Sequence, residues 1–136
     1  VNSLLDSTVH GLRTLIPGIT VNIYRVPGAF EIPVCVKKLI ESNNVDVMIA
    51  LGVIIKGETA HAELVGSSVT QSLQEIATNF NTPIIHEVLL TENREQAIER
   101  CGGDKNRGKE AAKAAATMSE LFSSLDAANK RNPNLS

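Results

Sequence analysis

The stretch from Val45 to Ile55 is almost continuously apolar, and it constrains the fold more than any other part of this chain. A strand covered on both faces has this pattern, because neither of its alternating sides meets water. Such strands occur in parallel sheets that carry helices on both faces. Two shorter segments, Val21–Val26 and Ile84–Leu90, predict further strands of the same sheet.

Amphipathic segments separate the predicted strands. Their apolar residues recur every three or four positions, which predicts helices with one buried face. Pro17-Gly18 ends the first helix, and Asn93 with Gln96 has the spacing of a capping box at the start of a short helix. The apolar stripes are Leu5, Val9, Leu12 and Ile16; Ile32, Val36, Leu39 and Ile40; Val65, Val69, Leu73, Ile76 and Phe80; and Ala111, Ala115, Met118, Phe122 and Leu125.

This alternation of strands and helices predicts an α/β fold, a three-layer αβα sandwich with a parallel sheet of flavodoxin-like type. We expect one domain over residues 1–128 and a polar, frayed tail over residues 129–136. Such a domain should open with a strand, whereas this chain opens with a helix. We therefore expect a first strand that is absent from this sequence or supplied by other residues. Ligands of open α/β sheets bind at the carboxyl ends of the strands.

Composition narrows the classes of function. A net charge of −2, a pI near 5.9 and few aromatic residues disfavour nucleic-acid binding. Cys35 and Cys101 have no metal-site spacing, and the histidines do not cluster with carboxylates, so we expect no metal and two thiols in or near the core. No apolar run is long enough to span a bilayer. We expect a cytoplasmic protein, or an organellar one if a transit peptide has been removed.

The segment Gly52–His61 carries the clearest chemical signal. A buried strand runs into a small-residue turn that opens a helix, where free backbone N–H groups and the helix dipole attract anions. Gly57 allows a ligand to approach the backbone, and Thr59 offers a hydroxyl. His61, placed one step inside the helix, has the right pKa class for proton transfer near neutrality. An exposed, solvated histidine in a first helical turn is the alternative interpretation.

Four segments taken together carry a family resemblance: Val26–Pro33, Gly52–His61, Glu95–Arg100 and Asn106–Gly108. In order and spacing the chain resembles the 6,7-dimethyl-8-ribityllumazine synthases, from the first helix to about Leu125. The resemblance implies condensation of 5-amino-6-(D-ribitylamino)uracil with 3,4-dihydroxy-2-butanone 4-phosphate, in riboflavin biosynthesis, with release of phosphate and water. It implies no metal or organic cofactor. It also implies a homo-oligomer built from pentamers, as a single pentamer or a larger cage.

The resemblance also implies roles for individual residues. His61 matches the proton-transferring histidine, and Arg100 matches an arginine that holds the substrate phosphate from a neighbouring subunit; the alternative for Arg100 is a surface residue paired with a carboxylate. The matching phosphate turn is Gly57, Glu58 and Thr59. The residues that match the ribityl-pyrimidine site are Ala29, Phe30, Glu31, Val53, Ile54 and Ile55. From sequence alone, Phe30 is more often a core residue and Glu31 a helix N-terminal acid.

Three departures from the family pattern affect this comparison. Arg107 stands where the family often has lysine, which keeps the charge and changes the geometry. His86-Glu87 stand where many members have Phe-Gly, so a titratable ring replaces an aromatic wall of the pyrimidine pocket; we favour a structural histidine over a second base. The aromatic residue that stacks on the pyrimidine in the family would lie upstream of Val1.

Other functions fit parts of the same sequence. An archaeal-type riboflavin synthase has a related fold, but the Gly57–Thr59 turn with His61 favours the condensing enzyme. A non-catalytic flavin or lumazine carrier, or a cage-forming homologue, would keep the fold and lose His61 or Arg100. A phosphate-responsive signalling module would need an acidic acceptor at a strand end, whereas Asp46 lies at a strand start. The condensing enzyme is therefore the function that we predict.

Overall fold

The computed structural model describes residues 1–58, 60–103 and 106–131. These residues form two strands, five α-helices and two short 3₁₀ turns. In chain order the elements are α1 (Asn2–Leu15), η1 (Ala29–Glu31), α2 (Ile32–Ser42), β1 (Met48–Ile55), η2 (Lys56–Glu58), α3 (Ala62–Phe80), β2 (Ile84–Thr91), α4 (Arg94–Gly102) and α5 (Gly108–Arg131).

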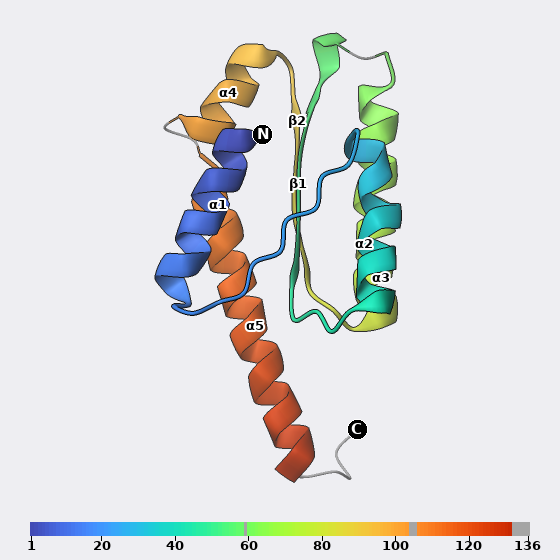
Figure 1. Ribbon diagram of the computed structural model, residues 1–136. Coiled ribbons are helices and arrows are strands. Elements are labelled where there is room, and N and C mark those ends of the chain that lie inside the picture. The colour runs from blue at the N-terminus through green and yellow to red at the C-terminus, as the bar shows by residue number, and fades with distance from the viewer. Residues whose placement is uncertain (59, 104–105, 132–136) are drawn as a thin grey trace.

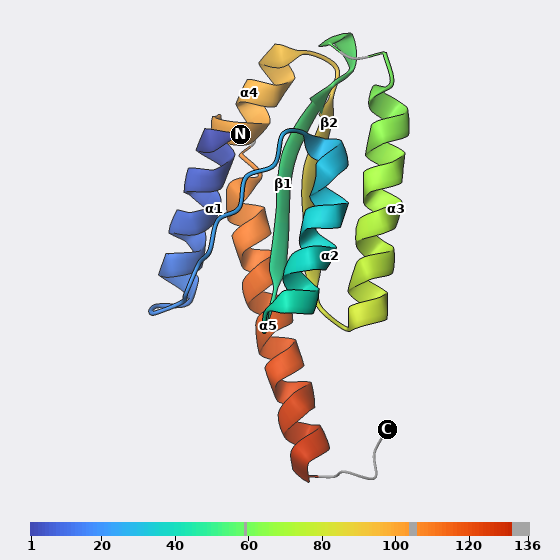
Figure 2. The same cartoon turned by 45° about the vertical axis from the view of Figure 1, so that its right-hand side comes forward.

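The elements form three layers around the two strands (Figures 1 and 2). Helices α2 and α3 cover one face of the sheet, and α1, α4 and α5 cover the other. Strands β1 and β2 are parallel, in a register that runs from Met48 opposite Ile84 to Ile55 opposite Thr91. Both strands therefore end at the same edge of the sheet. The predicted α/β sandwich with a parallel sheet is confirmed.

Each face of the sheet has its own apolar core, because alternate side chains of a strand point to opposite faces. On the α2–α3 side, Val36, Val69 and Leu73 pack against Ile54 and Val88. On the other side, Leu12 of α1 packs with Ala112 and Ala115 of α5, and Ile85 lies against them. The predicted stripes of α2 and α3 thus face the core, except for Phe80 at the end of α3, which is exposed. Cys101 is buried and Cys35 is half-buried, as expected.

Helices α1 and α5 pack closely because small residues line their contact. A Cβ atom on Gly11 would lie 2.7 Å from Cβ of Ala112, and one on Gly108 would lie 2.5 Å from Cβ of Ser7. The buried residues of α1 are Leu4, Thr8 and Leu12, so the stripe predicted through Leu5 and Val9 was displaced by one residue. Leu5 and Val9 are half-buried. The position of α5 decides which side of α1 is covered.

The strand predicted at Val21–Val26 is not formed. This segment runs from the α1 layer to the start of α2 beside the sheet (Figure 1), and residues 22–25 are exposed. A strand needs a neighbouring backbone to complete its ladder. Among the described residues none supplies one, since the sheet contains only β1 and β2. The alternation in Val21–Val26 instead places Val21 and Val26 against the two cores.

Other boundaries differ by a few residues from the expectations. Strand β1 begins at Met48 rather than Val45, and β2 continues to Thr91. Helix α5 continues to Arg131 and projects beyond the other elements (Figure 2), so residues 129–131 are helical rather than tail, and residues 132–136 lie outside the described part. Leu125 on this projecting end is half exposed. Within the described ranges no helix combines the length and apolarity that crossing a membrane requires.

Candidate functional site

The turn that follows β1 forms one wall of a shallow hollow beside His61. The turn begins as η2, and His61 is the residue immediately before α3, so the expectation that His61 lies inside the helix was wrong by one position. His61 is exposed and lines a hollow of about 300 Å³. The residues around this hollow are Lys56, Ala60, His61, Ala62, Glu63 and Leu64.

A second hollow, of about 330 Å³, lies at the same edge of the sheet between η1 and the end of β1. The two elements meet there because the chain enters α2 at the edge where β1 ends. Seven residues predicted as substrate-binding line this hollow: Ala29, Phe30, Glu31, Val53, Ile54, Ile55 and Glu58. Phe30 is 61 % exposed, so it is not the core residue that a phenylalanine usually is. The structure therefore brings together two predicted segments that are more than twenty positions apart in the sequence.

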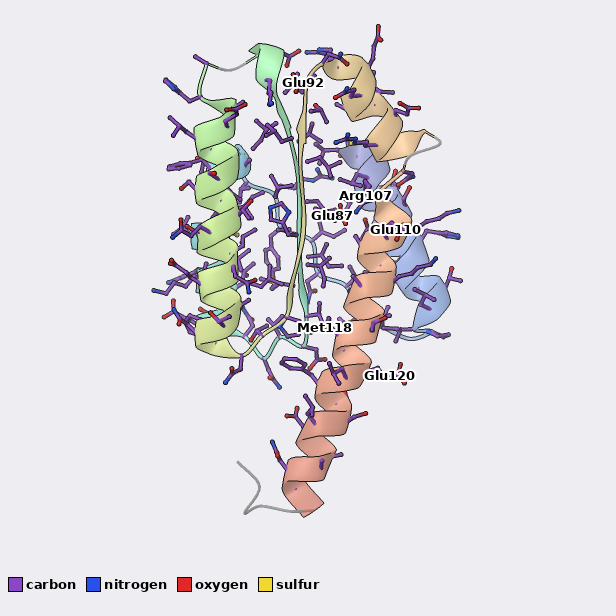
Figure 3. All side chains as sticks on the ribbon, turned by 180° about the vertical axis from the view of Figure 1, so that it is seen from behind. Glu87, Glu92, Arg107, Glu110, Met118 and Glu120 are labelled. Atoms are coloured by element: carbon purple, nitrogen blue, oxygen red, sulfur yellow. The ribbon has the colours of Figure 1, made fainter. Side chains whose placement is uncertain are left out.

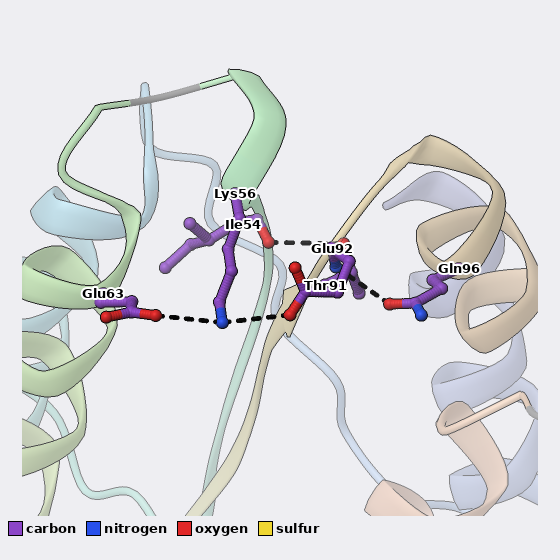
Figure 4. Close-up of polar contacts among 6 residues, drawn as sticks. All are labelled: Ile54, Lys56, Glu63, Thr91, Glu92 and Gln96. Carbon is purple, nitrogen blue, oxygen red and sulfur yellow. Dashed lines mark hydrogen bonds and ion pairs between the residues drawn. The ribbon is translucent and has the colours of Figure 1, made fainter.

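Lys56 joins the turn to two other elements (Figure 4). Its Nζ atom lies 3.0 Å from Oε1 of Glu63 in the first turn of α3, and 3.1 Å from Oε1 of Glu92 after β2. Lys56 donates hydrogen bonds to both carboxylates, and these bonds raise its pKa, the bond to Glu63 contributing most and the bond to Glu92 next. Sequence reasoning did not identify this cluster, because its three residues come from separate elements. The one sequence feature that could have indicated the cluster is a lysine that directly follows a buried strand.

Further polar contacts hold the loops at this edge. Nε of Arg94 lies 2.7 Å from Oε1 of Glu58, which ties the turn to the start of α4. The buried hydroxyl of Thr91 donates to the carbonyl of Ile54 at 3.4 Å, where the two strands end. Asn93 caps α4 as predicted, by accepting from the N–H of Gln96 at 2.9 Å. The Gln96 side chain in turn accepts from the N–H of Glu92, one residue earlier than in an ideal capping box.

His86 lies away from the carboxyl edge. It stands opposite Ala50 near the middle of β2, and its Nε2 atom is 2.9 Å from Oγ1 of Thr70 on α3. The Thr70 hydroxyl donates its single proton to the carbonyl of Gly66 at 2.8 Å. The Thr70 oxygen is therefore the acceptor for Nε2–H of His86. This bond supports the interpretation of His86 as a structural histidine.

Arg100 and Arg107 are not brought to the two hollows within one chain. Arg100 is half-buried in α4, on the other side of the sheet from α3. Arg107 precedes α5, and its Nε atom lies 3.5 Å from Oε2 of Glu87 on β2 (Figure 3). Neither arginine is among the residues that line the hollows. Thr59, also predicted to bind phosphate, lies outside the described residues.

The described side chains of the two hollows are unsuited to a dianion by themselves. The charged residues that line them are one lysine, Lys56, and three glutamates, Glu31, Glu58 and Glu63. The lysine is already paired with Glu63 and Glu92, and Glu58 is itself paired with Arg94 of α4. A phosphate group bound at the turn would need a further cation to offset this negative charge.

Comparison with known proteins identifies the family of this chain. The model of the 6,7-dimethyl-8-ribityllumazine synthase family matches residues 1–123. The chain belongs to this family. The 6,7-dimethyl-8-ribityllumazine synthases of Burkholderia mallei strain SAVP1 and Burkholderia pseudomallei strain K96243 are each 45 % identical over 126 residues, which is 92 % of this chain and 71 % of the relative. The enzyme of Burkholderia multivorans is 44 % identical over 92 % of this chain and 72 % of its own length.

Membership in the lumazine synthase family agrees with the arrangement at the sheet edge. The matched region contains all four segments on which the resemblance rested, from Val26–Pro33 to Asn106–Gly108. Two of them, around η1 and around η2, meet at the carboxyl edge of the sheet. The other two surround Arg100 and Arg107 in the α4–α5 region.

Proposed function

We propose that this chain condenses 5-amino-6-(D-ribitylamino)uracil with 3,4-dihydroxy-2-butanone 4-phosphate to form 6,7-dimethyl-8-ribityllumazine, releasing phosphate and water. Family membership supports this reaction. The single structural observation that supports it best is the meeting of η1, the end of β1 and the turn before His61 at one edge of the sheet. Ligands of open α/β sheets bind at this edge.

The reaction needs positioning and proton transfer more than a protein nucleophile. An amine of the uracil attacks the ketone carbon, and the carbonyl oxygen leaves as water. Elimination of phosphate leaves an enol, which takes up a proton to become a second ketone. The second amine attacks this ketone carbon and closes the ring, and the ketone oxygen leaves as a second water. Each step moves protons, and His61 is the proton carrier that we assign to them because it lines the hollow next to the turn. In this proposal the hollow of Ala29–Glu31 and Val53–Ile55 holds the ribityl-pyrimidine. The backbone of Gly57 and its neighbours holds the phosphate.

We propose further that each site is completed by a neighbouring copy of the chain, in an oligomer built from pentamers. The hollows carry three glutamates and one lysine, so the phosphate dianion needs a cation that these residues do not supply. Helix α4, which carries Arg100, lies on the opposite side of the sheet from α3. A second subunit can present Arg100 to the turn, where its planar fork would bond two phosphate oxygens.

The reaction is tested by incubating the purified protein with both substrates and following the fluorescence of the lumazine product. A protein-free mixture is the control, because these reactive partners also condense without an enzyme. We expect a rate far above this background. A rate equal to the background, from a folded protein, would contradict the proposed function.

The shared site is tested by mixing His61→Ala with Arg100→Ala protein in equal amounts, after dissociation and reassembly. If each site takes His61 from one chain and Arg100 from the next, about a quarter of the sites receive both intact residues. Activity should recover to about that fraction of the wild-type value. Each variant dissociated and reassembled alone is the control. Mixed oligomers as inactive as their parents, or a fully active monomer, would contradict the shared site.

A further inference from the structure

Glu87 is a buried carboxylate on the α5 side of the sheet. Only 6 % of the residue is exposed. It lies two positions after Ile85 in β2, and therefore on the same face of the sheet, toward α5 (Figure 3). The surroundings on that face include the fully buried Ala111 and Ala112 of α5. A carboxylate that loses its water in this way needs a cation to compensate it.

Arg107 supplies that cation and joins three elements. Its Nε atom lies 3.5 Å from Oε2 of Glu87 on β2. Its backbone N–H donates to the carbonyl of Arg100 in α4 at 2.7 Å, and its own carbonyl accepts from the N–H of Ala111 in α5 at 3.0 Å. The residue thus holds the connection between α4 and α5 against β2. Its backbone also contacts the helix turn that carries Arg100.

We propose that Arg107 is a positioning residue, the counter-ion of Glu87, and that it does not contact the substrate phosphate. Moving the guanidinium to a ligand would leave the Glu87 carboxylate buried without a cation, which is unfavourable. Glu87 and Arg107 both depart from the family pattern, and in this proposal the arginine compensates the charge of the glutamate. This inference rests on the proposed function, because it leaves Arg100 as the arginine that binds the phosphate.

The ion pair is tested by a double-mutant cycle of thermal unfolding with E87Q, R107Q and the double variant E87Q/R107Q. R107Q should lower Tm by roughly 5 °C, because it leaves the buried Glu87 carboxylate without its opposite charge. E87Q should lower Tm less, because the Arg107 side chain is 49 % exposed and remains hydrated. The double variant should lose clearly less than the sum of the two, since neither charge remains. R107K, which keeps the charge, should recover part of the loss. K113Q, on an exposed position of α5, is the control for removing one positive charge.

The role in catalysis is tested by the KM for the butanone phosphate at a temperature at which every variant is folded. We expect R107Q to stay within about twofold of wild type and R100Q to rise tenfold or more, since charged hydrogen bonds to phosphate are strong. The double variant matters most here, because it keeps the charge balance of the pair and lacks the guanidinium. It too should keep a KM near that of wild type.

Two results would overturn the inference. One is additive Tm losses in the cycle, with the double variant recovering nothing. The other is a KM for the phosphate substrate that rises as much in R107Q and E87Q/R107Q as in R100Q, which would make Arg107 a phosphate ligand. An inactive wild-type protein would instead remove the proposed function, and the unfolding cycle would still decide whether Arg107 is the counter-ion of Glu87.

Discussion

Gly108, the residue that follows Arg107 at the start of α5, gives a sharp test of the packing between α1 and α5. It is buried, and its φ is not in the left-handed region, so alanine fits its backbone conformation. The obstacle is space. A Cβ atom there would lie 2.5 Å from Cβ of Ser7 and 3.0 Å from the backbone carbonyl oxygen of Leu4. Carbon atoms in ordinary contact are about 3.5–4.0 Å apart.

The change Gly108→Ala must therefore push α5 away from α1 by about 1 Å or distort both helices. Overpacking of this kind costs about 1–3 kcal/mol, and the backbone contact with Leu4 places our estimate near 2–3 kcal/mol. At this chain length the loss corresponds to a fall in Tm of roughly 8–12 °C. The greater helix propensity of alanine offsets little at the first position of a helix, where the N–H is not bonded within the helix.

Thermal unfolding followed by far-UV circular dichroism measures the effect, and Ser7→Gly is the partner variant. That change removes the Cβ atom that Gly108→Ala would strike, although it also removes the hydrogen bond from Nδ2 of Asn106 to the Ser7 hydroxyl, 2.6 Å long. We expect the double variant to lose clearly less stability than the two singles added together. A Gly108→Ala protein with Tm within 2 °C of wild type would refute the reasoning.

Three further predictions concern the carboxyl edge of the sheet. Gly57→Ala should change the free energy of unfolding by no more than about 0.5 kcal/mol, because the new Cβ would meet only the Glu92 carbonyl oxygen at 3.6 Å. It should raise the KM for the butanone phosphate if the phosphate approaches this backbone. An unchanged KM would show that Gly57 has no part in phosphate binding. His61→Ala should lower turnover by about 10²-fold or less, with both KM values nearly unchanged, and full activity at every pH would remove His61 from the mechanism. Lys56→Met should lower Tm at neutral pH, because the ion pairs of Lys56 stabilise the fold while it is charged. The Tm difference from wild type should shrink as the pH rises above 10.5, through the raised pKa of Lys56, where the lysine loses its charge. A Tm difference that stays constant to pH 12 would contradict this.

The local sequence predicted much of the fold. The apolar stripes of α2 and α3, the stop at Pro17-Gly18 and the cap at Asn93 depend on residues a few positions apart, so they can be recognised without a tertiary structure. The motifs around Ala29–Glu31 and Gly57 were expected at the carboxyl ends of strands. The parallel register of β1 and β2 explains why one edge of the sheet gathers such ends.

What the sequence by itself determined, then, is the order of helices and strands, the family and the segments that line the candidate site. Only the tertiary structure decided which partners those segments have. Val21–Val26 carries a strand pattern, but no described backbone lies beside it to complete a ladder. Lys56 with Glu63 and Glu92, and Glu87 with Arg107, are pairs between separate elements. Such pairs depend on the register of two strands and the placement of helices against them, and no local spacing in the chain encodes those distances.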